Sequence, residues 1–401
     1  MRAPLISLLL SVLALTTPPT AAAQVTLDPP GSRQPVALKA PRVPPLPEAQ
    51  WTDVHRQVLA KFPGYGPADN AVKTLLNLPE LVDGLVPYTI YLSDESSLAP
   101  RHRELLILRT AWLTGSQVIW SRHAPRAGAA GLDAGDLRRI AQGADTAGWD
   151  PVEATLIRLA DQLYRNSSVT DATWRALAAS YHMFHLMDAV ETVNHFTVLS
   201  MVYHSFGVQP DAGTKDRLPD IPYRVVVPPR EPPLAAPRVE APAGRGIAVG
   251  RTFGLYPLLS QRWGPRQGFV NRVSKLTPRH REMLILRMGW NCRSEYEWAQ
   301  HVGRVGRARE HGLDPVRIAQ GATAEGWDPA EQAILRAADE LYRDLMVSDA
   351  TWRALSERFD TGLRMSAVVS SSAYRAISMS LNTYGVPLEP GNERFPVLAG
   401  R

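Results

Sequence analysis

The sequence predicts an all-α protein made of two tandem copies of one helical domain. The first observation is an internal repeat: residues 171–177 (Asp-Ala-Thr-Trp-Arg-Ala-Leu) recur unchanged 178 positions later, at 349–355. The second is that helix-capping residues precede apolar runs with helical spacing. The third is that no segment shows a convincing strand pattern. A fixed period indicates a duplicated unit, so each copy is expected to fold as a helical domain.

Two further motifs keep the same offset. Residues 100–104 (Pro-Arg-His-Arg-Glu) correspond to 278–282, and residues 148–151 (Gly-Trp-Asp-Pro) correspond to 326–329. The repeat therefore covers most of each copy, and no large insertion separates the elements of one copy from those of the other.

The proline-rich stretches and the repeat set the expected domain boundaries. The first domain is assigned to residues 48–212 and the second to residues 246–392. Proline-rich segments at 24–47 and 213–245 are expected to be an extended tether and an interdomain linker.

The first 23 residues have the pattern of a signal peptide. Arg2 gives a positive start, residues 5–15 form a short apolar run, and Ala21-Ala22-Ala23 offers a small-residue cleavage site before Gln24. The run is shorter than the roughly 18 residues that a spanning helix needs. We therefore expect export to the periplasm or the extracellular medium, with no membrane association after processing.

Capping residues predict where the helices begin. Thr277-Pro278 is an N-cap followed by proline at the first helical position. Asp150-Pro151 and Asp328-Pro329 are expected to start a later helix in the two copies, and Ser294 and Glu297 have the spacing of a capping box. The remaining helices are a short one capped by Thr170 or Ser348 and a long last one over about 182–205 or 365–383.

Composition excludes several kinds of site. Cys292 is the only cysteine, so neither an intramolecular disulfide nor a Cys-x-x-Cys metal or redox site can form. The net charge of +5 comes from arginines interleaved with carboxylates, without a block of like charges. We therefore expect no nucleic-acid partner.

The ordered motifs of each copy resemble the carboxymuconolactone decarboxylase family, which includes alkyl hydroperoxidase D (AhpD). The resemblance covers about residues 70–210 and 250–390. It is best in the second copy, over residues 276–287 (Leu-Thr-Pro-Arg-His-Arg-Glu-Met-Leu-Ile-Leu-Arg) and 295–301 (Glu-Tyr-Glu-Trp-Ala-Gln-His). It implies AhpD-like helical domains and assembly into homo-oligomers, and we expect the two copies to pair as an intramolecular pseudo-dimer.

The resemblance also points to a glutamate and a histidine in each copy. Glu282 lies nineteen residues before His301, and Glu104 lies nineteen residues before His123. This spacing is similar to that of a glutamate and a histidine in the family's peroxidase branch.

The peroxidase branch also has a Cys-x-x-Cys pair, which this sequence lacks. The two cysteine positions hold Ser294 and Glu297 in the second copy, and Ser116 and Ile119 in the first. The resemblance therefore does not extend to dithiol peroxidase chemistry.

The second copy offers a complete polar set for proton transfer. Ser294, Glu297 and His301 fall on one helical stripe, and Glu282 comes from the preceding helix. A carboxylate beside an imidazole can relay a proton. We therefore predict cofactor-free acid/base catalysis of a decarboxylase, lactone or isomerase type on a small-molecule substrate. The second copy is expected to carry the working site, because Ile119 replaces Glu297 in the first.

Structural roles for the same residues stay open. Ser294 and Glu297 can simply cap a helix, and His301 can be a hydrogen-bonded, half-buried histidine. Glu282 can form an ion pair with Arg281 or Arg287.

Two other functions also stay open. One is hydroperoxide reduction by Cys292 with an external thiol, because a helix N-terminus near Arg293 lowers the pKa of a thiol. The other is a non-catalytic binding module.

The last helix of the first copy carries one more polar pattern. His185, Asp188, Glu191 and His195 step by three or four residues, which fits metal ligands on one face and equally fits a solvated face. The second copy has Leu363, Ser366, Val369 and Ala373 at these positions. The duplication therefore gives no support for a metal, and we expect no cofactor.

Overall fold

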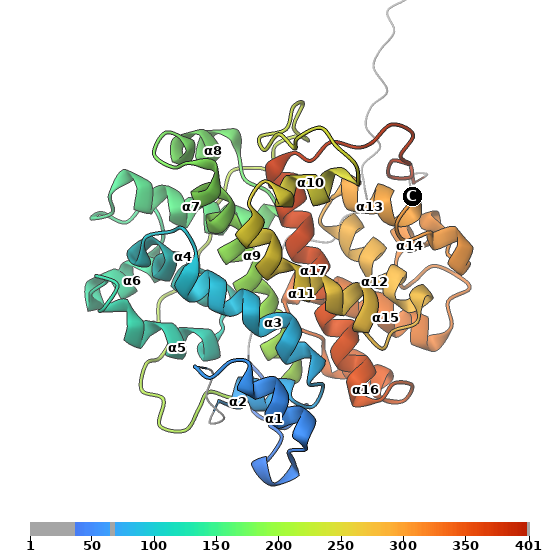
Figure 1. The fold of residues 1–401 in the computed structure, drawn as a ribbon, viewed down its shortest axis with the longest axis horizontal. Helices are drawn as coiled ribbons and strands as arrows, with labels where there is room; N and C mark the ends of the chain where they lie inside the picture. The colour runs from blue at the N-terminus through green and yellow to red at the C-terminus, as the bar shows by residue number, and fades with distance from the viewer. Residues whose placement is uncertain (1–36, 65–68, 399–401) are drawn as a thin grey trace, which may run out of the picture.

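The computed structural model describes residues 37–64 and 69–398, and every regular element among them is a helix (Figure 1). The predicted all-α class is confirmed. None of these described helices is long and apolar enough to cross a membrane. The predicted signal peptide and residues 24–36 of the tether lie outside the described residues, so both stay predictions.

The helices of the first half lead from a small N-terminal group to one long helix. They are η1 (Glu48–Gln50), α1 (Asp53–Ala60), α2 (Asn70–Leu75), α3 (Glu80–Ile90), the π-helical turn η2 (Tyr91–Glu95), α4 (Pro100–Thr114), α5 (Gln117–Ala127), α6 (Ala134–Gln142), α7 (Pro151–Asn166), α8 (Asp171–Ala178) and α9 (Met183–Phe206).

The second half repeats the order of α3 to α9 after one short extra helix. Its elements are α10 (Ala248–Gly254), α11 (Pro257–Gly268), the π-helical turn η3 (Phe269–Val273), α12 (Pro278–Asn291), α13 (Glu295–Val302), η4 (Ala308–His311), α14 (Pro315–Gln320), α15 (Pro329–Asp344), α16 (Asp349–Ser356) and α17 (Thr361–Tyr384).

The predicted helix starts agree with the structure, with one difference in a cap. Asp150 and Asp328 accept backbone N–H bonds at the starts of α7 and α15, each within a capping box. α13 begins directly after Ser294, but the Ser294 hydroxyl makes no capping bond. The expected capping box at this helix is therefore wrong, because Glu297 binds the imidazole of His301 instead.

Two long helices, α9 and α17, form the centre of the molecule. Their side chains are buried along almost the whole length of both helices, as expected for helices surrounded by protein rather than lying at a surface. α9 packs against α17, and α3 packs against α11, so equivalent helices join the two halves (Figure 1). α4 and α5 contact α9, and α12 and α13 contact α17 in the same way.

A segment of the expected tether is docked onto both halves. Arg42 and Val43 donate their backbone N–H groups to the carbonyl of Phe206, at 2.9 and 3.0 Å, where α9 ends. The Arg42 guanidinium reaches the second half and donates to the Val347 carbonyl and to the Asp349 carboxylate, both at 2.6 Å. We call this set of bonds the Arg42 clasp.

The linker makes the same contacts in the opposite direction. Arg238 and Val239 donate their N–H groups to the Tyr384 carbonyl, at 2.8 and 3.2 Å, where α17 ends. The Arg238 guanidinium donates to the Val169 carbonyl at 2.9 Å and to Asp171 at 3.1 Å, both in the first half. This Arg238 clasp and the Arg42 clasp each tie one half of the molecule to the other.

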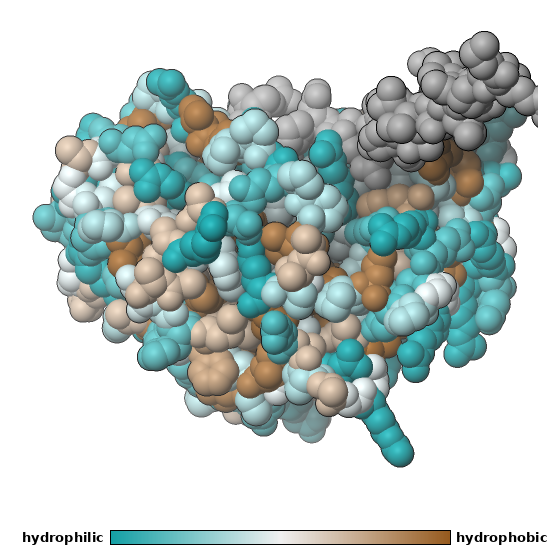
Figure 2. Space-filling view, turned by 90° about the horizontal axis from the view of Figure 1, so that it is seen from above, coloured by the Kyte–Doolittle hydropathy of each residue, from teal (hydrophilic) through white to brown (hydrophobic). Residues whose placement is uncertain are grey.

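The surface in Figure 2 mixes hydrophilic and hydrophobic residues. Outside the grey region, the hydrophobic areas of this face are small and are interrupted by hydrophilic side chains. Obligate partners usually bury broad apolar areas, and this face does not show one. The expected assembly into homo-oligomers stays a prediction.

Candidate functional site

A glutamate and a histidine meet in each half. In the first half, His123 in α5 donates its Nδ1–H to Oε2 of Glu104 in α4, at 2.8 Å. In the second half, His301 in α13 donates to Oε2 of Glu282 in α12, at 2.6 Å. All four side chains are buried. The sequence spacing thus brings these pairs together, and we call them the first dyad and the second dyad.

The second dyad is occupied at both imidazole nitrogens. Glu297, one turn before His301, accepts the Nε2–H at 2.9 Å. Burial lowers the pKa of His301, but the two carboxylates outweigh burial and raise it to about 10. Burial also opposes ionisation of Glu282, yet His301 and Arg281 together lower the pKa of this carboxyl. At neutral pH His301 is therefore an imidazolium clamped between two carboxylates.

The chain after α13 covers the second dyad. The N–H groups of Val305 and Gly306 bind the Gln300 carbonyl at 2.8 and 3.2 Å. A Cβ at residue 306 would collide with the Glu282 carboxylate and with the backbone of His301, so this close approach requires glycine. The covered, doubly bonded imidazolium has the features of a structural ion pair.

The first dyad leaves one imidazole nitrogen unoccupied. Ile119 stands where the second half has Glu297, and no residue that the structure describes hydrogen-bonds to Nε2 of His123. The imidazole lines a cavity of about 10 Å³, with Thr89 and Tyr203 among the other walls. Such a volume is about enough for one water molecule. His123 thus has a nitrogen that is available for proton transfer.

The predicted serines do not take part in the dyads. The hydroxyls of Ser116 and Ser294, the residues before α5 and α13, are buried and have no hydrogen-bond partner among the described residues. The polar set expected in the second half therefore contains Glu282, Glu297 and His301, without a bond from Ser294.

Cys292 is not in a reactive environment. Its side chain is fully buried at the end of α12, with Sγ 3.7 Å from the sulfur of Met288. Burial raises the pKa of the thiol, against a smaller opposing effect of Arg375. The expected lowering of this pKa near Arg293 is therefore wrong, because desolvation outweighs the nearby positive charges. A buried, protonated thiol is a poor nucleophile.

The polar pattern of α9 forms hydrogen bonds within the protein. Its described residues do not gather into a possible metal site. Asp188 and Glu191 accept hydrogen bonds from hydroxyl groups, and His195 lies between a hydroxyl and a guanidinium. These partners are Tyr91 and Ser97 for Asp188, Tyr88, Ser380 and Tyr384 for Glu191, and Thr89 and Arg266 for His195.

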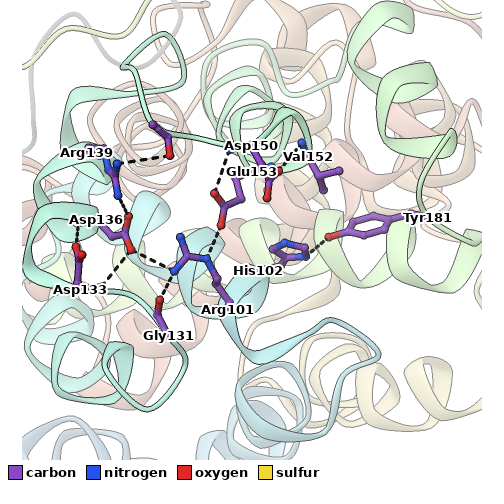
Figure 3. Close-up of polar contacts among 11 residues, drawn as sticks. Arg101, His102, Gly131, Asp133, Asp136, Arg139, Asp150, Val152, Glu153 and Tyr181 are labelled. Atoms are coloured by element: carbon purple, nitrogen blue, oxygen red, sulfur yellow. Dashed lines mark hydrogen bonds and ion pairs between the residues drawn. The ribbon is translucent and has the colours of Figure 1, made fainter.

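Another group of possible metal ligands lies where α4 and α7 begin. Figure 3 shows His102, Asp150 and Glu153, whose ligand atoms lie within 4.8 Å of one another. Both carboxylates already have partners, because Asp150 caps α7 and Glu153 accepts a bond from Nε of Arg101 at 2.5 Å. The Tyr181 hydroxyl lies 2.5 Å from Nδ1 of His102.

The second half repeats the cap and the ion pair of this group. Asp328 caps α15, and Glu331 accepts a bond from Nε of Arg279 at 2.6 Å. Helix capping and ion pairing therefore account for these carboxylates in both halves. The sequence pattern identifies Asp150 as a helix start but gives no sign that His102 lies beside it.

Comparison with known proteins supports a family relationship for part of the chain. No curated protein matches it. Among solved structures, the chain is similar to an alkylhydroperoxidase AhpD core, an uncharacterized peroxidase-related protein from Ralstonia eutropha JMP134. The two sequences are 16% identical, and the TM-score is 0.37. The match covers 42% of this chain and 93% of that one. The chain is also similar, at 16% identity and a TM-score of 0.38, to an uncharacterized peroxidase-related protein from Silicibacter sp. TM1040, with 47% and 97% covered. Residues 79–162, which hold α3 to α6, most of α7 and the Glu104–His123 dyad, match the model of the carboxymuconolactone decarboxylase family.

Proposed function

We propose that the first dyad is the working site of a cofactor-free acid/base enzyme that acts on a small organic molecule. The observation that carries this proposal is the difference between the two histidines. His123 has a carboxylate at Nδ1 and a cavity beside its ring, whereas His301 has a carboxylate at each nitrogen. Only a nitrogen that is not already bonded can exchange a proton with a substrate.

The first dyad has the arrangement of a general base and its orienting carboxylate. Glu104 accepts the Nδ1–H of His123, which leaves the lone pair on Nε2. Nε2 can then take a proton from a carbon next to a carbonyl group and return it to the same or a neighbouring carbon. This chemistry serves isomerisation of an unsaturated lactone. When Nε2 has first taken a proton from solvent, it can also protonate the carbanion that remains after a carboxylate leaves as carbon dioxide.

The size of the cavity limits the substrate class. Its volume of about 10 Å³ has room for about one water, so a substrate must displace wall side chains such as Val118, Ile119 and Tyr203. We therefore propose a substrate of a few carbon atoms beyond its reacting carbonyl.

This proposal reverses the sequence-based preference for the second half. The sequence suggested that Glu297 orients His301 for catalysis, and that Ile119 weakens His123. In the structure Glu297 occupies the nitrogen that would have to react. Ile119 leaves the corresponding nitrogen of His123 open.

Thiol peroxidase activity has less support. It would depend on Cys292, whose side chain is fully buried and whose pKa is raised. A non-catalytic binding module remains the outcome if the first dyad proves inactive.

We propose that the chain is exported and that its mature form starts at Gln24, on the pattern of residues 1–23. We also propose that it assembles into homo-oligomers, as its family resemblance implies.

Proton exchange tests the proposed function without knowledge of the natural product. Purified protein is incubated in D₂O with a panel of small unsaturated lactones and β-keto acids. NMR follows the loss of α-proton signals by exchange and the conversion of β-keto acids to their decarboxylated products. We expect exchange or decarboxylation with the wild type, and a loss of about 10²-fold or more in His123→Gln, because general acid/base catalysis contributes that much.

The matched control is His301→Gln in the second dyad. It should retain most of the activity under conditions where circular dichroism shows the folded protein. Greater loss in His301→Gln than in His123→Gln would contradict the proposal and return the working site to the second half.

A further inference from the structure

The protons of His195 are fixed by its two neighbours. Arg266 of α11 places NH1 at 3.3 Å from Nδ1 of His195, and a guanidinium can only donate, so Nδ1 is the acceptor. Nε2 then carries the hydrogen and donates to Oγ1 of Thr89 at 2.8 Å. The Thr89 hydroxyl in turn donates to the Leu85 carbonyl at 2.9 Å. His195 is therefore the neutral Nε2–H tautomer.

The electrostatic environment agrees with a neutral His195. Its side chain is fully buried in α9. Burial and the positive charge of Arg266 both lower the pKa of His195 far below its ordinary range.

This chain of bonds ends at the cavity of the first dyad. Thr89 lines that cavity together with His123. The ring of Phe196, another cavity wall, contacts His123 edge to face at 5.2 Å and His195 at 5.8 Å between centroids. His195 therefore contacts two walls of the proposed site, Thr89 and Phe196.

Arg266 is costly to keep in this position. It is fully buried, and its Nε and NH2 groups have no hydrogen-bond partner among the described residues. Its guanidinium lies 5.0 Å from the centroid of the Tyr88 ring. Unpaired buried donors destabilise a fold, and the positive charge of Arg266 offsets part of this cost by favouring the ionised form of the buried Glu191 carboxylate.

The arrangement exists in one half only. At the positions related by the repeat, Tyr88 corresponds to Arg266, Gln267 to Thr89 and Ala373 to His195. The second half therefore cannot build the same chain beside His301. The two copies have diverged so that the second supplies a residue to the first.

We propose that Arg266 is a positioning residue for the first dyad, acting through His195 on the Thr89 and Phe196 walls of the His123 cavity. This inference rests on the proposed function of the first dyad. It implies that the first half is incomplete as a site without α11 of the second half.

Nitrogen NMR of histidine-labelled protein tests this proposal directly. The long-range coupling pattern of each imidazole distinguishes the two neutral tautomers, and we expect the Nε2–H pattern for His195 in the wild type. Arg266→Met should abolish that single pattern and shift the signals of His123. Arg266→Lys, which can still donate to Nδ1, should restore it at least in part. Thr89→Val, which removes the acceptor of Nε2–H, provides a second perturbation if Arg266→Met does not fold.

The control is another buried arginine that joins the halves. Arg375 of α17 is fully buried and donates to the Tyr164 carbonyl of the first half at 3.1 Å. Arg375→Met should leave the signals of His195 and His123 unchanged. With a substrate that the wild type turns over, Arg266→Met should lower kcat by on the order of tenfold to a hundredfold. A small misplacement of catalytic groups has an effect of this size.

The outcomes separate the two proposals. An Nδ1–H tautomer in the wild type, unchanged spectra in Arg266→Met, or equal changes in Arg375→Met would overturn the positioning role. If the spectra change as expected but the wild type turns over no substrate, the proposed function fails while the arrangement of Arg266 and His195 stands. Unchanged turnover in Arg266→Met would limit Arg266 to a structural role.

Discussion

At the residue scale, one side chain decides what each histidine can do. Glu297 makes His301 a doubly bonded cation, and Ile119 leaves His123 with one unoccupied nitrogen. The sequence alone shows that these two positions differ. It does not show which difference favours catalysis, because that depends on whether the carboxylate reaches the reacting nitrogen or the opposite one.

The clamped His301 should make stability depend on pH. Its pKa rises from an ordinary value of 6.5 to about 10 on folding, so its contribution is complete below pH 6.5 and is lost as pH rises toward 10. The lowered pKa of Glu282 has the opposite sign: its contribution is present above its ordinary value of 4.5 and is lost as pH falls below it. The pair should therefore stabilise most between about pH 4.5 and 6.5.

Urea unfolding of His301→Gln checks this prediction. We expect a loss of about 3 kcal/mol at pH 6, because two buried carboxylates lose their cation, and a weaker fall in stability between pH 7 and 10 than in the wild type. Tyr374→Phe changes a ring that contacts His301 but keeps the ion pair, so it should keep the pH dependence. If the free energy of unfolding changed with pH in the same way in the wild type and in His301→Gln, this would contradict a stabilising imidazolium.

Cys292 should behave as an inert core residue. Its burial and raised pKa predict that a thiol reagent such as DTNB reacts with unfolded protein and hardly at all with the native protein. Cys292→Ser should also leave any activity of the first dyad unchanged. Rapid labelling of the native protein, or loss of activity in Cys292→Ser, would restore the thiol-based alternative.

At the element scale, the helix starts could be predicted because caps are local. Asp150 and Asp328 bind N–H groups within three residues of their own positions, so a short motif contains the whole interaction. The cap expected from Ser294 and Glu297 failed because His301, one turn later, competes for the same carboxylate. The docking of the proline-rich segments could not be predicted, because their partners lie far away in the sequence.

The two arginine clasps give a prediction for the interface. Arg42→Ala should lower the free energy of unfolding by about 1–2 kcal/mol, because the Val347 carbonyl loses a charged donor. Asp349→Ala should cost less than about 0.5 kcal/mol, because this carboxylate side chain is 76% exposed. Arg238→Ala should resemble Arg42→Ala, because its contacts are equivalent. Chemical denaturation of the three variants measures these differences.

A larger loss in Asp349→Ala than in Arg42→Ala would contradict this assignment. It would place the stabilising interaction in the exposed ion pair rather than in the bond to the backbone carbonyl.

At the scale of the whole molecule, the all-α class could be predicted from the repeat and the helix caps, and both dyads from the resemblance to the carboxymuconolactone decarboxylase family. The intramolecular pseudo-dimer remains a prediction, consistent with the contacts of α9 with α17 and of α3 with α11. The partners of Asp188, Glu191 and His195 could not be predicted, because several of them come from the other half. The absence of ionisable side chains at the positions in the second copy that correspond to Asp188, Glu191 and His195 was the signal that these three residues serve a different purpose from the repeated ones.

Export is a second property of the whole chain that can be tested. N-terminal sequencing of protein recovered from the periplasm or the medium should begin near Gln24, as the Ala21-Ala22-Ala23 pattern predicts. Protein that is found only in the cytoplasm with Met1 intact would contradict processing.

The central claim is that the unoccupied nitrogen of His123 does the chemistry, and the activity of Ile119→Glu tests it most directly. This change builds the second half's clamp into the first dyad, and Ile119→Leu is the control that keeps an apolar side chain of equal size. We predict that Ile119→Glu loses about 10²-fold or more of the proton-exchange activity, whereas Ile119→Leu retains most of it. Equal or greater activity in Ile119→Glu would show that a second carboxylate orients the imidazole for catalysis, and would contradict the assignment of the working site to the first half.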